Sequence, residues 1–337
     1  MKRINYINEY LKEKFGERTL KICIDGNFTC PNRDGKCGYG GCIFCSEKGS
    51  GEHIKSEYKA SETLYTSSSN LITNHATEIS SNNKSNIENT IQSISKQVNT
   101  YFSTYRAQRA NKFIIYFQNF TNTYDSIENL KARYDAALID KRIVGLSIAT
   151  RPDCIDEGVA KLLASYSKDY YVCVELGLQT SNNDTGNFIN RGYSSEDFTK
   201  AVRILNKYDI DTIAHIMIGL PNENKDTLKD TVAFINNHNL QGIKIHSTYI
   251  VKNTKLANLY FNKQYTPITL EEYLDSLTYV LTHINPNLVV HRISGDAPKD
   301  LLIAPEWNLH KKWVLNGIEK KLREKDLWQG KFYKSAE

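Results

Sequence analysis

The sequence has no long apolar run. No stretch of the 337 residues approaches the roughly 18 to 20 apolar residues that a membrane-spanning helix needs. Its start, Met1 to Tyr6, leads into an amphipathic pattern and lacks the apolar centre of a signal peptide. Apolar residues make up 40% of the chain and charged residues 24%, which is ordinary globular usage and excludes a fibrous or wholly disordered protein. We therefore expect a folded cytoplasmic protein without a membrane partner.

The sequence also lacks a second Cys-x2-Cys pair, so no further cysteine lies at a spacing that matches the pair in its cysteine-rich loop. Seven cysteines, an odd number without a secretion signal, argue against a disulfide framework. Cys30, Cys42 and Cys45 lie in one glycine-rich loop, and the last two form a Cys-x2-Cys pair. Structural zinc usually takes four protein ligands, and no later Cys or His pair completes such a set. A cubane iron-sulfur cluster on three thiolates would keep one iron open, so we favour a cluster over a zinc knuckle.

Short β-branched or aromatic runs recur along the chain with helical patterns between them. Six of them are nearly continuous in apolar residues, as in strands covered on both faces: 20–24, 113–117, 143–148, 171–176, 212–218 and 242–250. Repeated βα units of this kind predict a parallel sheet. Six units are too few for the eight-stranded barrel, so the expected fold class is α/β, a partial (β/α)6 TIM-like barrel with a mostly helical C-terminal extension.

The remaining segments flank or interrupt this barrel, which we place at residues 20–250. Residues 1–19 are expected to be a helical lead-in. Residues 61–96 are rich in Ser and Asn with little periodicity, and we expect a partly disordered surface insertion. Residues 251–337 are expected to form a basic, mostly helical extension packed on the barrel, with a short apolar run at 288–290.

Polar segments follow the predicted strands at the points where the strands end. They are the cysteine loop, 118–124, 149–153, 175–180 continued by 190–193, and 215–221. The carboxyl ends of the strands in such a barrel meet at one mouth, where catalytic groups lie. We therefore expect these segments to converge on one site.

Four motifs resemble the radical S-adenosylmethionine (SAM) superfamily and, within it, the YhcC/YtqA (MnmL-like) branch, which is related to the catalytic subunit of Elongator. They are Phe28-Thr29-Cys30-Pro31-Asn32-Arg33-Asp34-Gly35, Gly41-Cys42-x2-Cys45, Thr150-Arg151-Pro152-Asp153 and His291-Arg292-Ile293-Ser294-Gly295-Asp296-Ala297-Pro298. The resemblance implies a [4Fe-4S] cluster on Cys30, Cys42 and Cys45, whose fourth iron chelates the amino and carboxylate groups of SAM. Reduction of the cluster would cleave SAM to methionine and a 5′-deoxyadenosyl radical. Cys37 lies off this ligand pattern and is expected to be a bystander.

The resemblance also implies contacts between the protein and SAM. Gln179 and Arg191 stand at the spacing at which related enzymes bind its ribose and carboxylate, and the planar fork of Arg suits a carboxylate. Glu175 is expected either to accept a hydrogen bond from the cofactor or to pair with a neighbour. The cluster and SAM carry the chemistry, so no side chain is assigned a catalytic role.

Two further positions complete the predicted cofactor contacts. Many members of the superfamily have a Gly-Gly-Glu-Pro turn after the second strand, where this chain has Gln118-Asn119-Phe120-Thr121. The amino group of SAM is therefore expected to bind Gln118, Thr121 or backbone carbonyls. His215 is expected to face the barrel interior, either as a cofactor contact or as a packed, hydrogen-bonded histidine.

The branch implies tRNA as the substrate. Its members resemble enzymes that convert 5-carboxymethylaminomethyl-uridine at the wobble position to 5-aminomethyl-uridine, which a SAM-dependent methylase then completes. An electron donor such as flavodoxin or ferredoxin is implied as well. Basic clusters near both ends of the chain suit phosphates, and Tyr249, Tyr260 or Tyr273 could stack on a base. The alternatives are a radical enzyme on a small metabolite of the porphyrinogen type and a non-catalytic RNA-binding protein with a structural cluster.

Overall fold

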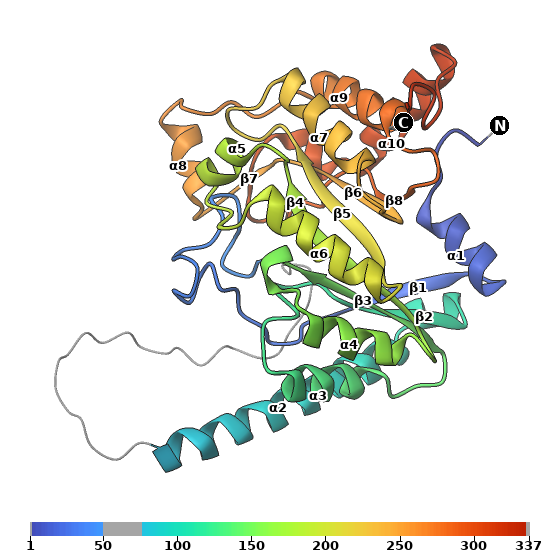
Figure 1. Cartoon of the computed structure of the whole chain (residues 1–337). Helices are drawn as coiled ribbons and strands as arrows, with labels where there is room; N and C mark the ends of the chain where they lie inside the picture. The colour runs from blue at the N-terminus through green and yellow to red at the C-terminus, as the bar shows by residue number, and fades with distance from the viewer. Residues whose placement is uncertain (1, 50–75, 335–337) are drawn as a thin grey trace.

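Seven parallel strands form one curled sheet in this computed structural model, which describes residues 2–49 and 76–334, except for the side chains of 76–85. In spatial order the strands are β1 (Thr19–Ile24), β2 (Lys112–Phe117), β3 (Ile143–Thr150), β4 (Tyr171–Gln179), β5 (Asp211–Ile218), β6 (Gly242–Ser247) and β8 (Val289–Arg292). Helices pack on the outside of this half-barrel (Figure 1). The predicted fold class, an α/β partial barrel followed by a mostly helical part, is confirmed.

Helices connect successive strands and form most of the C-terminal part. They are α1 (Ile7–Phe15), α2 (Ala76–Phe102), α3 (Ile127–Ala137), α4 (Glu157–Tyr166), α5 (Asn183–Phe188), α6 (Ser195–Lys207), α7 (Lys225–Asn236), α8 (Lys255–Phe261), α9 (Leu270–His283) and α10 (Lys311–Glu324). Capping residues begin the helices that follow the fourth and fifth strands. Ser194 and Asp197 form a capping box at α6, and Asn224 caps α7. Among the described residues, no helix has the length and apolar character that crossing a membrane requires.

The C-terminal edge of the sheet differs from the prediction. The run at 288–290 enters β8, which pairs with β6, so the described sheet has one strand more than the six expected. The sixth strand ends early, at Ser247, and β7 (Ile250–Val251) pairs antiparallel with β9 (Leu302–Ala304) in a separate small sheet. The reason is the length of β5: its last residue, Ile218, is the register partner of Ser247, so residues after Ser247 have no strand along which to continue the ladder and pair elsewhere.

The second part of the predicted insertion also differs from the expectation, because it is helical. Residues 76–96 belong to α2, which packs on α3 and β1. Ile87, Ile91, Ile94 and Val98 follow helical spacing, and the last two are fully buried. The expectation of little periodicity was wrong for this part, because burial of one apolar face outweighs the weak helix propensity of Ser and Asn. Residues 61–75 lie outside the described residues.

The N-terminal segment contacts both edges of the half-barrel. Backbone N of Val290 in β8 donates to O of Asn5 (2.7 Å), and Tyr6 forms a parallel bridge with the same residue. Helix α1 then packs on β1 and β8, the two edge strands. Because α1 directly precedes the start of β1, it lies near the amino ends of the strands, and the loops after the strands occupy the other end.

Candidate functional site

The cysteine loop follows β1 and docks against the segment that follows α5. Backbone N of Ile43 donates to O of Ile189 (3.0 Å), and the side chain of Asn190 donates to O of Gly41 (2.7 Å). In the other direction, Nδ2 of Asn32 donates to O of Asn190 (2.6 Å). A Cβ on Gly38 would lie only 2.5 Å from Oδ1 of Asn32, so a larger residue there would push the Asn32 side chain out of its present position. These contacts hold the predicted cluster loop and the segment 189–192 together, as the sequence analysis expected.

The three predicted cluster ligands, Cys30, Cys42 and Cys45, lie close enough to interact electrostatically. None of the seven cysteines, all within the described residues, forms a disulfide. Burial raises the pKa of the Cys42 thiol to about 12, and the neighbouring Cys45 and Cys30 add to this increase. Among the described residues, no three His, Cys, Asp or Glu side chains gather as ligands of one metal ion. Thiolates are the usual ligands of iron-sulfur clusters, and three of them from one loop would suit such a cluster.

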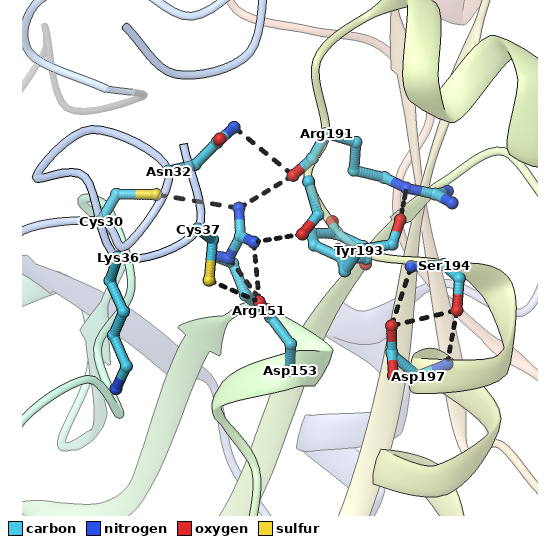
Figure 2. A network of polar contacts seen from close by, with 12 residues as sticks. Cys30, Asn32, Lys36, Cys37, Arg151, Asp153, Arg191, Tyr193, Ser194 and Asp197 are labelled. Atoms are coloured by element: carbon cyan, nitrogen blue, oxygen red, sulfur yellow. Dashed lines mark hydrogen bonds and ion pairs between the residues drawn. The ribbon is translucent and has the colours of Figure 1, made fainter. Parts of the chain in front are cut away.

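Arg151 links the cysteine loop to the rest of the site, as Figure 2 shows. Its Nη1 donates to O of Arg191 (2.9 Å) and lies 4.0 Å from Sγ of Cys30. Its Nε and Nη2 donate to the two carboxylate oxygens of Asp153 (2.9 and 2.8 Å). Burial disfavours the charge of Arg151, but Asp153 outweighs burial and raises the pKa of the guanidinium. Arg151 therefore brings a fixed positive charge beside a thiol that must be a thiolate to bind iron.

Arg191 fixes the backbone after β4. It is fully buried, and its guanidinium donates to the carbonyl oxygens of Leu178 (2.6 Å), Thr180 (2.6 Å) and Tyr193 (2.9 Å) and to Oδ1 of Asn183 (3.1 Å). The sequence analysis did not foresee this positioning role, because it depends on carbonyls that only the fold brings together. A contact between Arg191 and the carboxylate of SAM stays a prediction.

Gln179 ends β4 in an unusual backbone conformation. Its φ is +59°, in the left-handed region, and the register between β4 and β5 shifts there. Its Oε1 accepts a hydrogen bond from the hydroxyl of Tyr193 (2.7 Å). Non-glycine residues in this region cost of order 1 kcal/mol or more and tend to occur at functional sites, where the surroundings hold them. This location suits the predicted contact with the ribose of SAM, which stays a prediction.

The turn after β2 offers buried hydrogen-bond acceptors beside the cysteine loop. Backbone N of Thr121 donates to O of Thr29, which directly precedes Cys30 (3.2 Å). Oγ1 of Thr121 and Oδ1 of Asn119 are buried, and neither has a hydrogen-bond partner in the part of the chain that the structure describes. Gln118 is half-buried at the end of the strand. Buried polar atoms normally have partners, so these two oxygens fit the predicted place for the amino group of SAM.

Glu175 lies in the interior of the half-barrel and is fully buried. Its Oε1 accepts hydrogen bonds from Lys21 (2.7 Å) and Ser147 (2.9 Å), and its Oε2 accepts from Lys244 (2.7 Å) and lies 2.8 Å from Nε2 of His215. Burial alone would raise the pKa of Glu175, but Lys21 and Lys244 hold it well below its usual range. Of the two roles predicted for Glu175, the structure shows the ion pair. His215 faces the interior as a packed, hydrogen-bonded histidine.

The buried histidines predict that stability depends on pH. Burial, with Lys244 as the next cause, lowers the pKa of His215 from 6.5 to about 4, and burial also lowers the pKa values of His246 and His291. Between pH 6.5 and about pH 4, the two pKa values of His215, the unfolded chain binds more protons than the folded chain. The free energy of unfolding therefore decreases as the pH falls through this range. Urea unfolding of the apoprotein across this window should show the decrease, with a smaller slope for His215→Gln. A slope equal to that of the wild type would contradict this assignment, and His310→Gln, outside the barrel interior, is the control.

Comparisons with known proteins show which families and folds the chain resembles. A family model described as the radical SAM superfamily matches residues 35–235, and one described as the radical SAM C-terminal domain matches residues 240–324. The chain is 34% identical over its whole length to the protein YtqA of Bacillus subtilis, of which it covers 94%. Over 49% of its length it is 27% identical to a tRNA uridine(34) acetyltransferase of Methanocaldococcus jannaschii, of which it covers 30%. The structure of archaeal Elp3 from Methanocaldococcus infernus has the same fold, with a TM-score of 0.59 and 20% identity, over 71% of this chain and 60% of that one.

Proposed function

Because the chain belongs to the radical SAM superfamily, we propose that it modifies the wobble uridine of tRNA, converting 5-carboxymethylaminomethyl-uridine to 5-aminomethyl-uridine. The cofactors of this superfamily are a [4Fe-4S] cluster and SAM. When bound, they supply a 5′-deoxyadenosyl radical, and the proposed hydrogen donor is the carboxymethyl carbon of the modified base. The carbon radical left behind would give one electron to an acceptor such as the oxidised cluster, and water would hydrolyse the resulting imine, breaking its C–N bond to release 5-aminomethyl-uridine and glyoxylate. An electron donor such as flavodoxin or ferredoxin and a downstream methylase are part of the proposal.

The observation that carries the proposal is the docked cysteine loop. Cys30, Cys42 and Cys45 are the proposed cluster ligands, and they come from one loop at the carboxyl end of β1. Asn32 and Arg151 hold this loop against residues 189–192 and place a donor or a positive charge near two of the thiols: Nδ2 of Asn32 lies 3.9 Å from Sγ of Cys42. Hydrogen bonds to the sulfur ligands and nearby charge set the potential of such clusters. The same residues would therefore position the cluster and tune its reduction.

The proposed SAM contacts surround this loop. The unpartnered oxygens of Thr121 and Asn119 are the acceptors proposed for the amino group, because an amino group whose lone pair is bound to iron still has two N–H donors. Gln179, at the end of β4, is the residue proposed for the ribose. Placing SAM among buried groups keeps water away from a reactive radical.

A basic, aromatic surface on α10 supports a nucleic-acid substrate. Trp313 is 52% exposed, stacks on His310 (ring centroids 4.1 Å apart) and follows the exposed Lys311 and Lys312. Aromatic rings stack on unpaired bases, and neighbouring lysines bind phosphates. The relative named as a tRNA uridine(34) acetyltransferase supports the same substrate class. The tyrosine prediction was wrong for Tyr273, which is fully buried because it packs in the apolar core.

Nucleoside analysis of tRNA tests the substrate. In cells from which the gene has been deleted, we expect 5-carboxymethylaminomethyl-uridine to accumulate and 5-aminomethyl-uridine to disappear from the wobble position. Wild-type protein should restore the original profile, and Cys42→Ala should not restore it. A nucleoside profile that is unchanged by the deletion would rule out this substrate.

A further inference from the structure

The interior of the half-barrel holds more positive than negative side chains around Glu175. Lys21 and Lys244 each lie 2.7 Å from one of its oxygens. Arg292 of β8 is the register neighbour of Lys244 and pairs with Asp296 (3.0 Å). Lys311 Nζ also lies 3.7 Å from Oδ1 of Asp296, so among the described residues four lysine or arginine side chains pair with these two carboxylates. Lys244 and Glu175 are buried, whereas Arg292 is 30% exposed at the edge of the interior. Unbalanced charge that is shielded from water is costly, so an additional anion beside Lys244 would be stabilised.

The surplus charge lies beside polar atoms that have no partner. His246 stands two residues after Lys244 on β6, on the same face of the sheet and nearer the carboxyl end of the strand. Its ring centroid is 5.3 Å from that of His215, and its buried Nε2 has no hydrogen-bond partner within the described parts of the chain. The hydroxyls of Thr248 and Ser294, just beyond the ends of β6 and β8, are likewise buried and unpartnered there.

Lys244 has bonding capacity left for a ligand. Its ammonium donates to Oε2 of Glu175 (2.7 Å) and to the hydroxyl of Tyr116 (2.8 Å), and an ammonium has three donors. One donor is therefore left for a ligand.

The electrostatic surroundings of His246 also favour an anion. After burial, the groups that lower its pKa are His215, Arg292 and Lys244, and the opposing effect of Glu175 is smaller than each of theirs. Of these groups Arg292 and Lys244 carry positive charge at neutral pH, whereas His215, with its pKa near 4, is neutral there.

We propose that Lys244, His246 and Arg292 form a subsite for a carboxylate of the substrate. This inference rests on the proposed function and adds the group that is recognised. The 5-carboxymethylaminomethyl substituent carries one carboxylate, and its 5-aminomethyl product carries none. Binding of that carboxylate fixes the adjacent carboxymethyl carbon in the barrel interior, and loss of the carboxylate favours release of the product.

Two tRNAs that differ only in the carboxymethyl group, which carries the carboxylate, test the subsite. The probes are tRNA with 5-carboxymethylaminomethyl-uridine and tRNA with 5-aminomethyl-uridine at the wobble position, and their dissociation constants are measured on the holoprotein. We expect wild-type protein to prefer the first by about tenfold or more, as for a hydrogen-bonded charged group. Lys244→Met should abolish this preference without weakening binding of the second tRNA, while Lys244→Arg should retain part of it. Lys312→Met, on exposed α10, is the matched control and should weaken both tRNAs equally.

The outcomes separate the subsite from the proposed function. An unchanged preference in folded Lys244→Met, or equal weakening of both tRNAs, overturns the subsite, since the second result indicates a phosphate contact. If wild-type protein binds neither tRNA, the proposed function fails and a second probe decides the subsite. That probe is bromide soaked into crystals of the holoprotein. An anomalous peak beside Lys244 that is absent from Lys244→Met supports an anion subsite, and no peak overturns it.

Discussion

Replacing Cys42 with alanine is expected to abolish formation of 5′-deoxyadenosine from SAM. The proposed cluster has three thiolate ligands, so removal of one leaves a cubane that two thiolates cannot hold in place. Wild-type protein, reconstituted anaerobically with iron and sulfide, should bind about four irons per chain, as in a [4Fe-4S] cluster. The Cys42→Ala protein should retain little iron, and after reduction it should produce only background levels of 5′-deoxyadenosine. Iron analysis and liquid chromatography measure the two quantities.

Cys37 provides the matched control within the same loop. Its thiol is exposed and lies 3.8 Å from Oδ2 of Asp153, and it is not one of the proposed ligands. Cys37→Ala should therefore keep the iron content and the SAM cleavage of the wild type. Cleavage that persists in Cys42→Ala, or that disappears in Cys37→Ala, would contradict the assignment of the ligands.

Replacing Glu175 with leucine is expected to cause the largest loss of stability. The change leaves Lys21 and Lys244 in the barrel interior without their shared carboxylate, and removal of one partner from a buried ion pair costs about 3 to 5 kcal/mol. Urea unfolding of the apoprotein at neutral pH measures this cost. The control is Glu157→Gln, which removes an exposed ion pair with Lys207 and should change stability little.

A double variant checks the physical reason for this loss. If unpaired lysine charge causes the destabilisation, Glu175→Leu combined with Lys244→Leu should be more stable than Glu175→Leu alone, because one uncompensated charge is gone. A double variant whose stability is the sum of the two separate losses would show that lost packing, and not charge, is the cause. A Glu175→Leu protein as stable as the wild type would contradict the ion pair itself.

The sequence predicts those parts of the molecule whose signals are local. Continuous apolar runs predict the first five strands, and the Cys-x2-Cys spacing predicts the proposed cluster ligands within one loop. The Ser-rich start of α6 predicts its capping box at Ser194. In each case the residues that decide the structure are neighbours in the chain, so pattern and composition are sufficient.

The remaining features depend on contacts between distant residues. The partners of Arg191 are carbonyl groups, which have no sequence signature. The network around Glu175 joins side chains from β1, β3, β4, β5 and β6, so no single segment contains it. One signal was present, because Lys21 and Lys244 interrupt apolar strands, and a lysine in such a position needs a buried partner. Helix α2 was not predicted because its many Ser and Asn residues are weak helix formers and leave few apolar residues to show the helical spacing.

Transfer of deuterium tests the account most directly. The substrate is tRNA in which the carboxymethyl carbon of the modified wobble uridine carries deuterium, incubated with reconstituted, reduced protein and SAM. If the 5′-deoxyadenosyl radical removes hydrogen from that carbon, the 5′-deoxyadenosine formed gains the mass of one deuterium, and 5-aminomethyl-uridine appears in the tRNA. Unlabelled 5′-deoxyadenosine together with conversion of the nucleoside would contradict the proposed abstraction site, and SAM cleavage without any conversion would contradict the proposed substrate.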